Sequence, residues 1–189
     1  REHFPQDEIL SEETTSTIKD PAQSEHLWVI DPIDGTSNFK YQRNFSAVSI
    51  GYIEKGVIQL AAAYDPFRDE LFFAEKGQGA FVNDVRIKVG NVQEFTNANI
   101  CTGNSYDPDG TKEILQTILK IEPTPWVMIQ GSAVLEMCEV ACGRLDLFFH
   151  KFVKPWDNAA AFLIAAEAGA TIKDFHGETP TFMSNEVVM

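Results

Sequence analysis

The chain has 189 residues, 44% of them hydrophobic, which is enough for one large domain or two small ones with a sizeable core. Its formal net charge of −13 argues against a nucleic-acid polymer as partner, because such binding depends on basic contacts to phosphate. No apolar run reaches the ~18 residues of a membrane span, and the first residues lack the apolar stretch of a signal peptide, so no membrane partner is expected.

The first half of the chain is predicted to be an antiparallel meander of strands. Residues 1–26 are polar and loop-like apart from a short apolar turn at Ile9-Leu10, and residues 27–31 form a buried strand. A short helix is expected after Gly35. Apolar runs bounded by turn residues then predict strands at 46–53, 57–64, 70–75, 80–82 and 85–87.

Strand and helix alternate after about residue 95, which is typical of a layered α/β unit. Ser132 is expected to cap a helix that Gly143 ends. The predicted strands and helices are strands at 99–102, 126–129, 145–149 and 170–172 and helices at 111–120, 132–142 and 157–168. We therefore place a domain boundary near residue 96, between residues 1–96 and 97–189.

The three cysteines, Cys101, Cys138 and Cys142, are an odd number and do not indicate a disulfide framework. Cys138 and Cys142 share a helix face, but no further Cys or His follows at zinc-ligand spacing. Packed core thiols are favoured over a zinc site. Free thiols fit a reducing compartment, so a cytoplasmic location is expected.

The segment from Asp31 to Thr36, Asp-Pro-Ile-Asp-Gly-Thr, carries the clearest chemical signal. Both carboxylates follow a buried strand, and desolvated carboxylates repel each other unless a cation neutralises them. Hard divalent cations prefer oxygen ligands, and a tight glycine turn presents backbone N–H groups to phosphate. A plain turn needs one Asp and a Gly, so the second Asp favours a metal site beside a phosphate cradle.

Two further acidic residues lie at the ends of predicted elements. Glu12 closes the short apolar stretch that begins at Ile9, and Asp157 precedes the helix expected from Asn158. Taken alone, Asp157 is interpreted as a helix N-cap.

The net negative charge of the chain has two possible explanations: acidic solubility, or a site that gathers carboxylates around cations.

Several motifs together resemble the inositol monophosphatase family. Residues 28–39, Trp-Val-Ile-Asp-Pro-Ile-Asp-Gly-Thr-Ser-Asn-Phe, are similar to its first signature, and Ser11-Glu12-Glu13 is similar to its Gly-Glu-Glu metal loop. The matching segments in chain order are 4–13, 28–39, 131–133, 141–146, 156–161 and 167–170. Separated motifs in the right order across nearly the whole chain make the resemblance specific.

The resemblance implies an α+β / α/β fold, a layered α/β/α/β/α sandwich, and a homodimer. It also implies a Mg²⁺-dependent, Li⁺-sensitive phosphomonoesterase with two or three Mg²⁺ ions, which Ca²⁺ or Li⁺ replace with inhibition. The implied metal ligands are Glu12, Asp31, the carbonyl of Ile33, Asp34 and Asp157. The implied catalytic residues are Glu12, Asp31 and Thr36: Glu12 and Thr36 would help to activate the attacking water, and Asp31 would bridge two metal ions. The implied substrate contacts are Asp34, Gly35, Thr36, Gly131, Ser132, Ala133, His150 and Asp157.

The resemblance also assigns a role to each predicted domain. Residues 1–96 form the metal- and phosphate-binding part, incomplete at its start, and residues 97–189 supply the last metal ligand and the substrate contacts. The chain is expected to lack the family's N-terminal pair of helices and its last helix. The corresponding hypothesis is that the 189-residue chain is a weak catalyst, which comparable rates for a longer form would refute.

His150 is the departure that bears on the substrate. It lies seven residues before Asp157, where inositol-specific members place a Glu that binds sugar hydroxyls. With Lys151 and Lys154 it predicts a substrate with a second negative group, such as NADP(H), adenosine 3′,5′-bisphosphate or a sugar bisphosphate. The plainer alternative is that these side chains face water. Myo-inositol monophosphate remains the leading substrate, and a non-catalytic binding protein on the same fold is the alternative class.

Overall fold

The computed structural model describes residues 4–14, 18–105, 108–121 and 126–189. The α-helices are α1 (Thr36–Lys40), α2 (Pro108–Ile118), α3 (Ala133–Ala141) and α4 (Pro155–Glu167), and the 3-10 helices are η1 (Pro21–Gln23) and η2 (Phe95–Asn97). The strands are β1 (Glu8–Ser11), β2 (His26–Asp34), β3 (Ala47–Glu54), β4 (Val57–Asp65), β5 (Glu70–Glu75), β6 (Gly79–Val82), β7 (Val85–Arg86), β8 (Asn99–Thr102), β9 (Trp126–Met128), β10 (Leu147–His150) and β11 (Val187–Val188).

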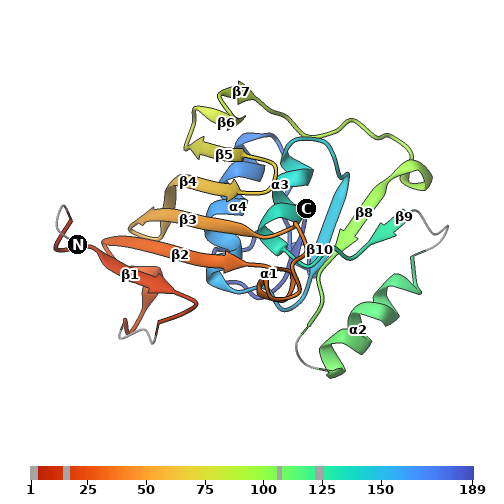
Figure 1. The fold of residues 1–189 in the computed structure, drawn as a ribbon, viewed down its shortest axis with the longest axis horizontal. Coiled ribbons are helices and arrows are strands. Elements are labelled where there is room, and N and C mark those ends of the chain that lie inside the picture. The colour runs from red at the N-terminus through yellow and green to blue at the C-terminus, as the bar shows by residue number, and fades with distance from the viewer. Residues whose placement is uncertain (1–3, 15–17, 106–107, 122–125) are drawn as a thin grey trace.

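Seven strands form one sheet in the order of the chain, β1 to β7 (Figure 1). All neighbours from β2 to β7 are antiparallel, which confirms the predicted meander. The predicted loop over residues 1–26 is wrong at Glu8–Ser11, which pairs in parallel with β2. This pairing buries Leu10 against Leu27 and Val29, so the short apolar turn gains a core contact as a strand.

The two faces of this sheet differ. Helix α4 lies across one face and approaches the backbone so closely that a Cβ on Gly51 would be 2.8 Å from the Ala159 Cβ. The other face leaves apolar side chains in solvent: the cross-strand neighbours Val48, Tyr64 and Leu71 are 38%, 37% and 44% exposed. Helix α4 is therefore fixed against the sheet by backbone contact.

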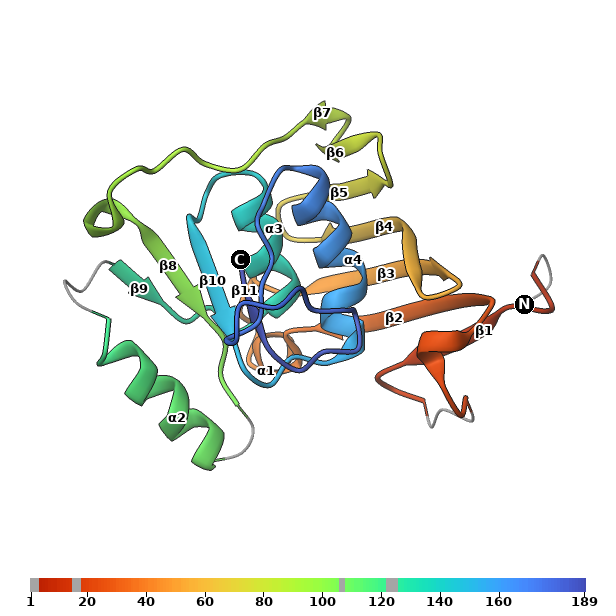
Figure 2. The ribbon, with the colours of Figure 1, turned by 180° about the vertical axis from the view of Figure 1, so that it is seen from behind.

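A second sheet of four strands runs in the order β11-β10-β8-β9, with β10, β8 and β9 parallel. Phe148 of β10 packs in the cluster that contains α3 and α4, whereas its neighbour Phe149 packs with Ile114 of α2. The helices α3 and α4 thus lie between the two sheets, and α2 covers the far side of the smaller sheet (Figure 2). The predicted layered α+β sandwich is confirmed, with a β/α/β/α order in the described residues.

The strand predicted at residues 170–172 is wrong. The N–H of Ala170 donates to the Ala165 carbonyl at 2.9 Å, so this residue belongs to the turn that ends α4 at Gly169. Only Lys173 makes an isolated bridge, to Val188, and β11 is the strand that pairs with β10.

The segment between β7 and β8 contains the predicted boundary near residue 96, and the division into two domains stays a prediction. Cys101, Cys138 and Cys142 are free thiols, and the first two are buried. Within the described ranges, the structure holds no helix with the length and apolarity that crossing a bilayer requires.

Candidate active site

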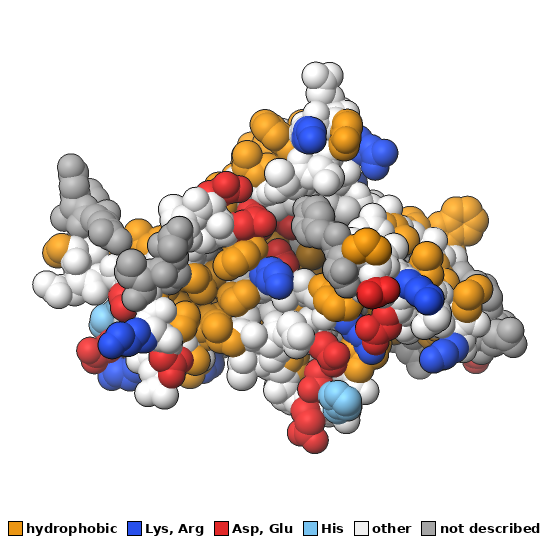
Figure 3. Space-filling model, turned by 90° about the horizontal axis from the view of Figure 1, so that it is seen from below, with side chains coloured by type: hydrophobic (Ala, Val, Ile, Leu, Met, Phe, Trp, Pro, Cys, Tyr) orange, Lys and Arg blue, Asp and Glu red, His pale blue; other side chains and the backbone are white. Residues whose placement is uncertain are grey.

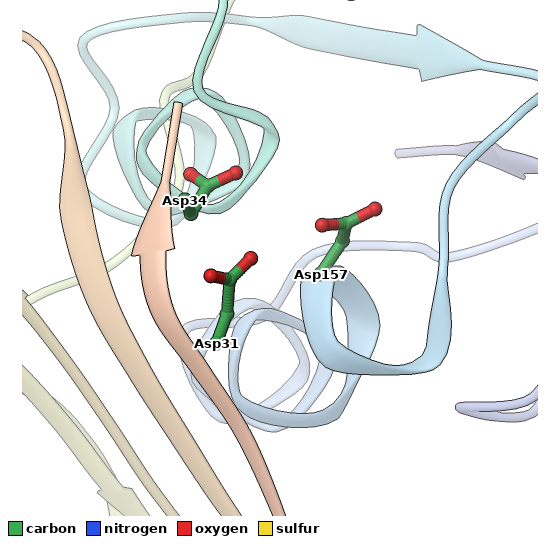
Figure 4. Close-up of side chains that lie close together, drawn as sticks. All are labelled: Asp31, Asp34 and Asp157. Carbon is green, nitrogen blue, oxygen red and sulfur yellow. The ribbon is translucent and has the colours of Figure 1, made fainter. Parts of the chain in front are cut away.

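Three aspartates meet where the two sheets and the layer of helices between them converge. Asp31 and Asp34 lie at the end of β2, and Asp157 lies in the first turn of α4 (Figure 4). One carboxylate oxygen of each lies within 4.8 Å of the others. Asp31 and Asp34 are buried and Asp157 is half-buried. The structure therefore brings together three of the acidic residues singled out in the sequence.

The irregular end of β2 explains why both of its aspartates reach this cluster. Residues 31 and 34 are an odd number of positions apart, so in a regular strand they would point to opposite faces. The pairing of β2 with β3 shifts register between Asp31 and Asp34, which breaks that alternation. Pro32 has no N–H for the ladder, and Asp31 Oδ1 accepts the Ile33 N–H at 3.0 Å. The local backbone thus turns both carboxylates the same way.

The cluster is electrostatically unfavourable without a cation. Burial raises the pKa of Asp31 to about 8, and the charges of Asp34 and Glu12 add to this shift. Burial also raises the pKa of Asp157 to about 8 and that of Asp34 to about 6. None of the ion pairs among the described residues includes these carboxylates. An all-oxygen donor set of this kind fits a hard divalent cation.

Asp34 is held by the start of α3. The Ser132 hydroxyl donates to Asp34 Oδ2, and the Val134 N–H donates to the same oxygen at 3.1 Å. Ser132 Oγ also accepts the Leu135 N–H at 3.3 Å, which confirms Ser132 as the N-cap of α3. Ser132 is fully buried, and its hydroxyl proton is used by Asp34.

The Gly35–Thr36 turn lies beside the aspartates. Gly35 has φ +80°, and a Cβ there would be 3.0 Å from the Phe45 carbonyl oxygen and 3.1 Å from that of Gly131. Only glycine suits this backbone and this space. Thr36 begins α1, so its N–H has no acceptor within the helix and is available to an anion. The Thr36 hydroxyl donates to the Ile33 carbonyl at 3.0 Å.

Asp157 does not cap α4 as an N-cap residue, which corrects the interpretation from sequence. The helix begins at Pro155, and Lys154 holds the N-cap position, because proline suits the first helical position and ends the preceding extended segment. Asp157 Oδ2 instead accepts the Lys154 N–H at 2.7 Å. This bond fixes the carboxylate in the first turn, facing the end of β2.

Glu12 stands at the rim of the cluster. It follows β1, whose register pairs Ser11 with Ile30, and its N–H donates to the Ile30 carbonyl at 3.3 Å. It is more exposed than the aspartates, and partial burial beside Asp31 raises its pKa. The parallel pairing of β1 with β2 therefore brings Glu12, a residue near the start of the chain, to the site.

These residues line a pocket of about 390 Å³, and acidic side chains gather in the hollow of the face that Figure 3 shows. The sequence-predicted residues that line it are Glu12, Asp31, Asp34, Gly35, Thr36, Gly131, Ala133, His150 and Asp157. Ile33 and Ser132 are not among the described lining residues. A hollow of about 420 Å³ elsewhere is mainly apolar, with Asp146 as its one carboxylate among the described lining residues.

The expectation that His150 is a cation is wrong. Its Nδ1 accepts the Phe152 N–H at 3.0 Å, so Nε2 carries the hydrogen and donates to the Asn104 carbonyl at 3.2 Å. Burial lowers the pKa of His150 to about 4, which keeps the ring neutral. Both ring nitrogens are therefore occupied within the protein.

The two lysines after His150 behave differently from each other. Lys151 Nζ pairs with Glu113 at 2.6 Å and lies 4.6 Å from the Phe175 ring centre. It does not line the pocket, whereas Lys154 does. Of the three residues that were predicted to meet a second negative group of the substrate, only Lys154 brings a positive charge to the pocket wall.

Sequence reasoning missed several residues of the pocket wall, including Asn104, Glu136, Phe152 and Trp156. Glu136 carried a detectable signal, because it and Glu139 are the two acidic residues of a helix that is otherwise apolar. Asn104 and Phe152 had none, since their place in the wall depends on how β8 and β10 pair.

A layered sandwich with a carboxylate cluster beside a glycine turn is compatible with a phosphatase that binds a metal and a phosphate group. The sequence model of the inositol monophosphatase family matches residues 1–189. The chain belongs to the inositol monophosphatase family and is thus a phosphatase-type hydrolase.

Individual relatives carry more than one name. The putative Nus factor SuhB of Neisseria meningitidis is 38% identical over 190 residues, covering 100% of this chain and 72% of the relative. The inositol monophosphatase structure from Anabaena superposes with a TM-score of 0.91 at 34% identity, covering 100% of this chain and 75% of the other. SaIMPase-II with 2′-AMP bound gives a TM-score of 0.84 at 29% identity, covering 99% and 72%.

Proposed function

We propose that this protein is a Mg²⁺-dependent phosphomonoesterase that hydrolyses a small phosphorylated metabolite, with myo-inositol monophosphate as the leading substrate. The cluster of Asp31, Asp34 and Asp157 carries the proposal, because crowded oxygen donors with raised pKa values need a cation. Glu12 and the Ile33 carbonyl complete the donor set for two or three Mg²⁺ ions. When bound, Mg²⁺ neutralises charge on the phosphoryl oxygens and acidifies water.

The protein groups around the cluster supply orientation and proton transfer. The N–H groups of the Gly35–Thr36 turn hold the phosphate. Because the Thr36 hydroxyl donates to the Ile33 carbonyl, its oxygen is left to accept a hydrogen bond from water. Glu12 at the rim takes a proton from that water as the water oxygen bonds to phosphorus. The ester P–O bond breaks, and the leaving oxygen takes a proton from solvent and departs as the alcohol.

Phosphate release from myo-inositol 1-phosphate tests this proposal. Activity is expected with Mg²⁺ and not with EDTA, and Asp157→Asn is expected to reduce kcat/KM by about 100-fold or more. Lys151→Ala is the matched control on the neighbouring segment, because Lys151 pairs with Glu113 away from the pocket. Activity that survives EDTA, or that Asp157→Asn leaves intact, would refute the proposal.

A nucleotide is the second candidate substrate, and the neutral His150 favours it. With both ring nitrogens occupied, His150 offers no carboxylate acceptor to polyol hydroxyls, while Lys154 can meet a second negative group. The structural neighbour with 2′-AMP bound supports the same class. Comparison of kcat/KM for myo-inositol 1-phosphate, 2′-AMP, NADP⁺, adenosine 3′,5′-bisphosphate and fructose 1,6-bisphosphate decides between the candidates.

A non-catalytic binding protein on the same fold is the alternative class, and the Nus-factor name of a relative is its motive. Calorimetric titration with Mg²⁺ and Ca²⁺ separates the two, because a binding protein without a metal site takes up neither ion. We also propose a homodimer, which light scattering after gel filtration tests.

A further inference from the structure

Glu136 is a buried carboxyl group without a cationic partner. It lies in the first turn of α3 and is fully buried, and no ion pair among the described residues includes it. A carboxyl group in this position is costly unless hydrogen bonds compensate for the lost water. Glu136 is part of the pocket wall, so the groups to which it is hydrogen-bonded also belong to the surroundings of the pocket.

The backbone hydrogen bonds that Glu136 accepts come from a single peptide segment. Its Oε1 accepts the Gln130 N–H at 2.8 Å and the Gly131 N–H at 2.9 Å. Its carboxyl group also contacts the thiol of Cys101. One carboxyl oxygen therefore fixes two successive peptide groups, and it does so from a helix that also holds Asp34 through Ser132.

The segment that Glu136 fixes is held from the other side by α1. Asn38 Nδ2 donates to the Gln130 carbonyl at 2.8 Å, and Gln130 Nε2 donates to Glu139 at 2.8 Å. Gly131 packs against the Gly35–Thr36 turn, because a Cβ on Gly35 would be 3.1 Å from the Gly131 carbonyl oxygen. A displacement of Gly131 would therefore also displace the backbone at Gly35.

We propose that Glu136 is a positioning residue that sets the distance between the Gly131 wall and the Gly35 turn, and so shapes the seat of the phosphate. The inference rests on the proposed function, because it assigns a role within the same pocket. Glu136 acts through Gln130 and Gly131 and not on the reacting atoms. It is expected to govern KM for the phosphate ester while leaving Mg²⁺ binding unchanged.

Two variants separate positioning from bulk packing. Glu136→Gln keeps an Oε1 acceptor, whereas Glu136→Leu keeps a similar volume without an acceptor. We expect KM to stay within about threefold in the first variant and to rise about tenfold or more in the second, the effect of two lost hydrogen bonds. Mg²⁺ affinity by calorimetry is expected to stay within about twofold in both. Met137→Leu, at a buried neighbour in α3, is the control.

The proposal is overturned if Glu136→Leu leaves KM unchanged, if Glu136→Gln is as impaired as Glu136→Leu, or if Met137→Leu raises KM equally. Amide hydrogen exchange decides the case in which Glu136→Leu does not fold. Slow exchange at Gln130 and Gly131 in the unmodified protein and in Glu136→Gln supports the role, and fast exchange at both amides rejects it.

A failure of the proposed function gives a different result. If no phosphate ester is hydrolysed, the phosphatase proposal fails, and binding of inorganic phosphate in the presence of Mg²⁺ still tests Glu136. An approximately tenfold loss of phosphate affinity in Glu136→Leu, restored in Glu136→Gln, supports the positioning role. Equal phosphate affinity in all three proteins rejects it.

Discussion

Replacing Asp31 by Asn is expected to stabilise the metal-free protein at neutral pH, although it removes a central group of the site. The asparagine retains a carbonyl oxygen for the Ile33 N–H, which Asp31 accepts at 3.0 Å. It cannot ionise, and so it removes the repulsion between residue 31 and the carboxylates of Asp34 and Asp157. Mg²⁺ binding is expected to be lost in the same variant, because a charged ligand has been removed.

The magnitude follows from the pKa of Asp31, which rises from 3.8 to about 8 on folding. Between these values the folded protein keeps a proton that the unfolded chain has released, so stability falls as pH rises. Each pH unit costs at most about 1.4 kcal/mol, and sharing of the effect among neighbouring carboxylates reduces the loss between pH 4 and 7 to about 2 to 4 kcal/mol. The side-chain amide that Asp31→Asn introduces has an unpaired N–H, which reduces the benefit. The free energy of unfolding at pH 7 is therefore expected to rise by about 2 kcal/mol.

Urea unfolding at pH 5 and pH 8, in EDTA and in Mg²⁺, measures this effect. The unmodified protein is expected to lose stability from pH 5 to pH 8 in EDTA and to regain it with Mg²⁺, while Asp31→Asn shows a smaller loss, carried by Asp34 and Asp157, and no response to Mg²⁺. Glu8→Gln, at an exposed carboxylate of β1, is the control. If the metal-free protein becomes more stable between pH 5 and pH 8, or if Asp31→Asn is the less stable protein at pH 8, the electrostatic reasoning is refuted.

Three other substitutions probe the scaffold of the site. Gly35→Ala forces a side chain into φ +80° within 3.0 Å of a carbonyl oxygen, so a loss of about 1–3 kcal/mol in thermal unfolding and a raised KM are expected. Gly51→Ala places a Cβ 2.8 Å from that of Ala159 and should displace α4, which a fall in Mg²⁺ affinity would reveal. Ser132→Ala removes a donor that lowers the pKa of Asp34, so that pKa should rise and the acidic limb of the pH–rate profile should move to higher pH.

Local sequence patterns predicted most of the fold. The meander from β2 to β7 was predictable because each strand is an apolar run closed by a turn, as at Glu54–Val57. The helix cap at Ser132 was predictable for the same reason, since capping depends on residues next to one another. The Asp31–Thr36 segment was predicted from its own pattern, whereas the roles of the other site residues came from the family resemblance. The clustering of these residues depends on β2, α3 and α4 meeting in the folded chain.

Features that depend on distant partners could not be predicted. The four-residue strand β1 has no alternating pattern of its own, and it forms because β2 offers a parallel edge. The neutral state of His150 depends on burial, and the position of its ring hydrogen depends on the Asn104 carbonyl, 46 positions away. The role inferred for Glu136 depends on two backbone groups and is invisible in side-chain patterns.

The break in register between Asp31 and Asp34 has a consequence for how this segment can vary. The side chains of Pro32 and Ile33 can change if the backbone keeps its irregular path. A deletion or insertion between the aspartates is a different matter, because it would change the irregular backbone path that now turns both carboxylates the same way. The spacing of this segment is therefore expected to tolerate less variation than the identity of the residues within it, and a length change here would remove a ligand without mutating one.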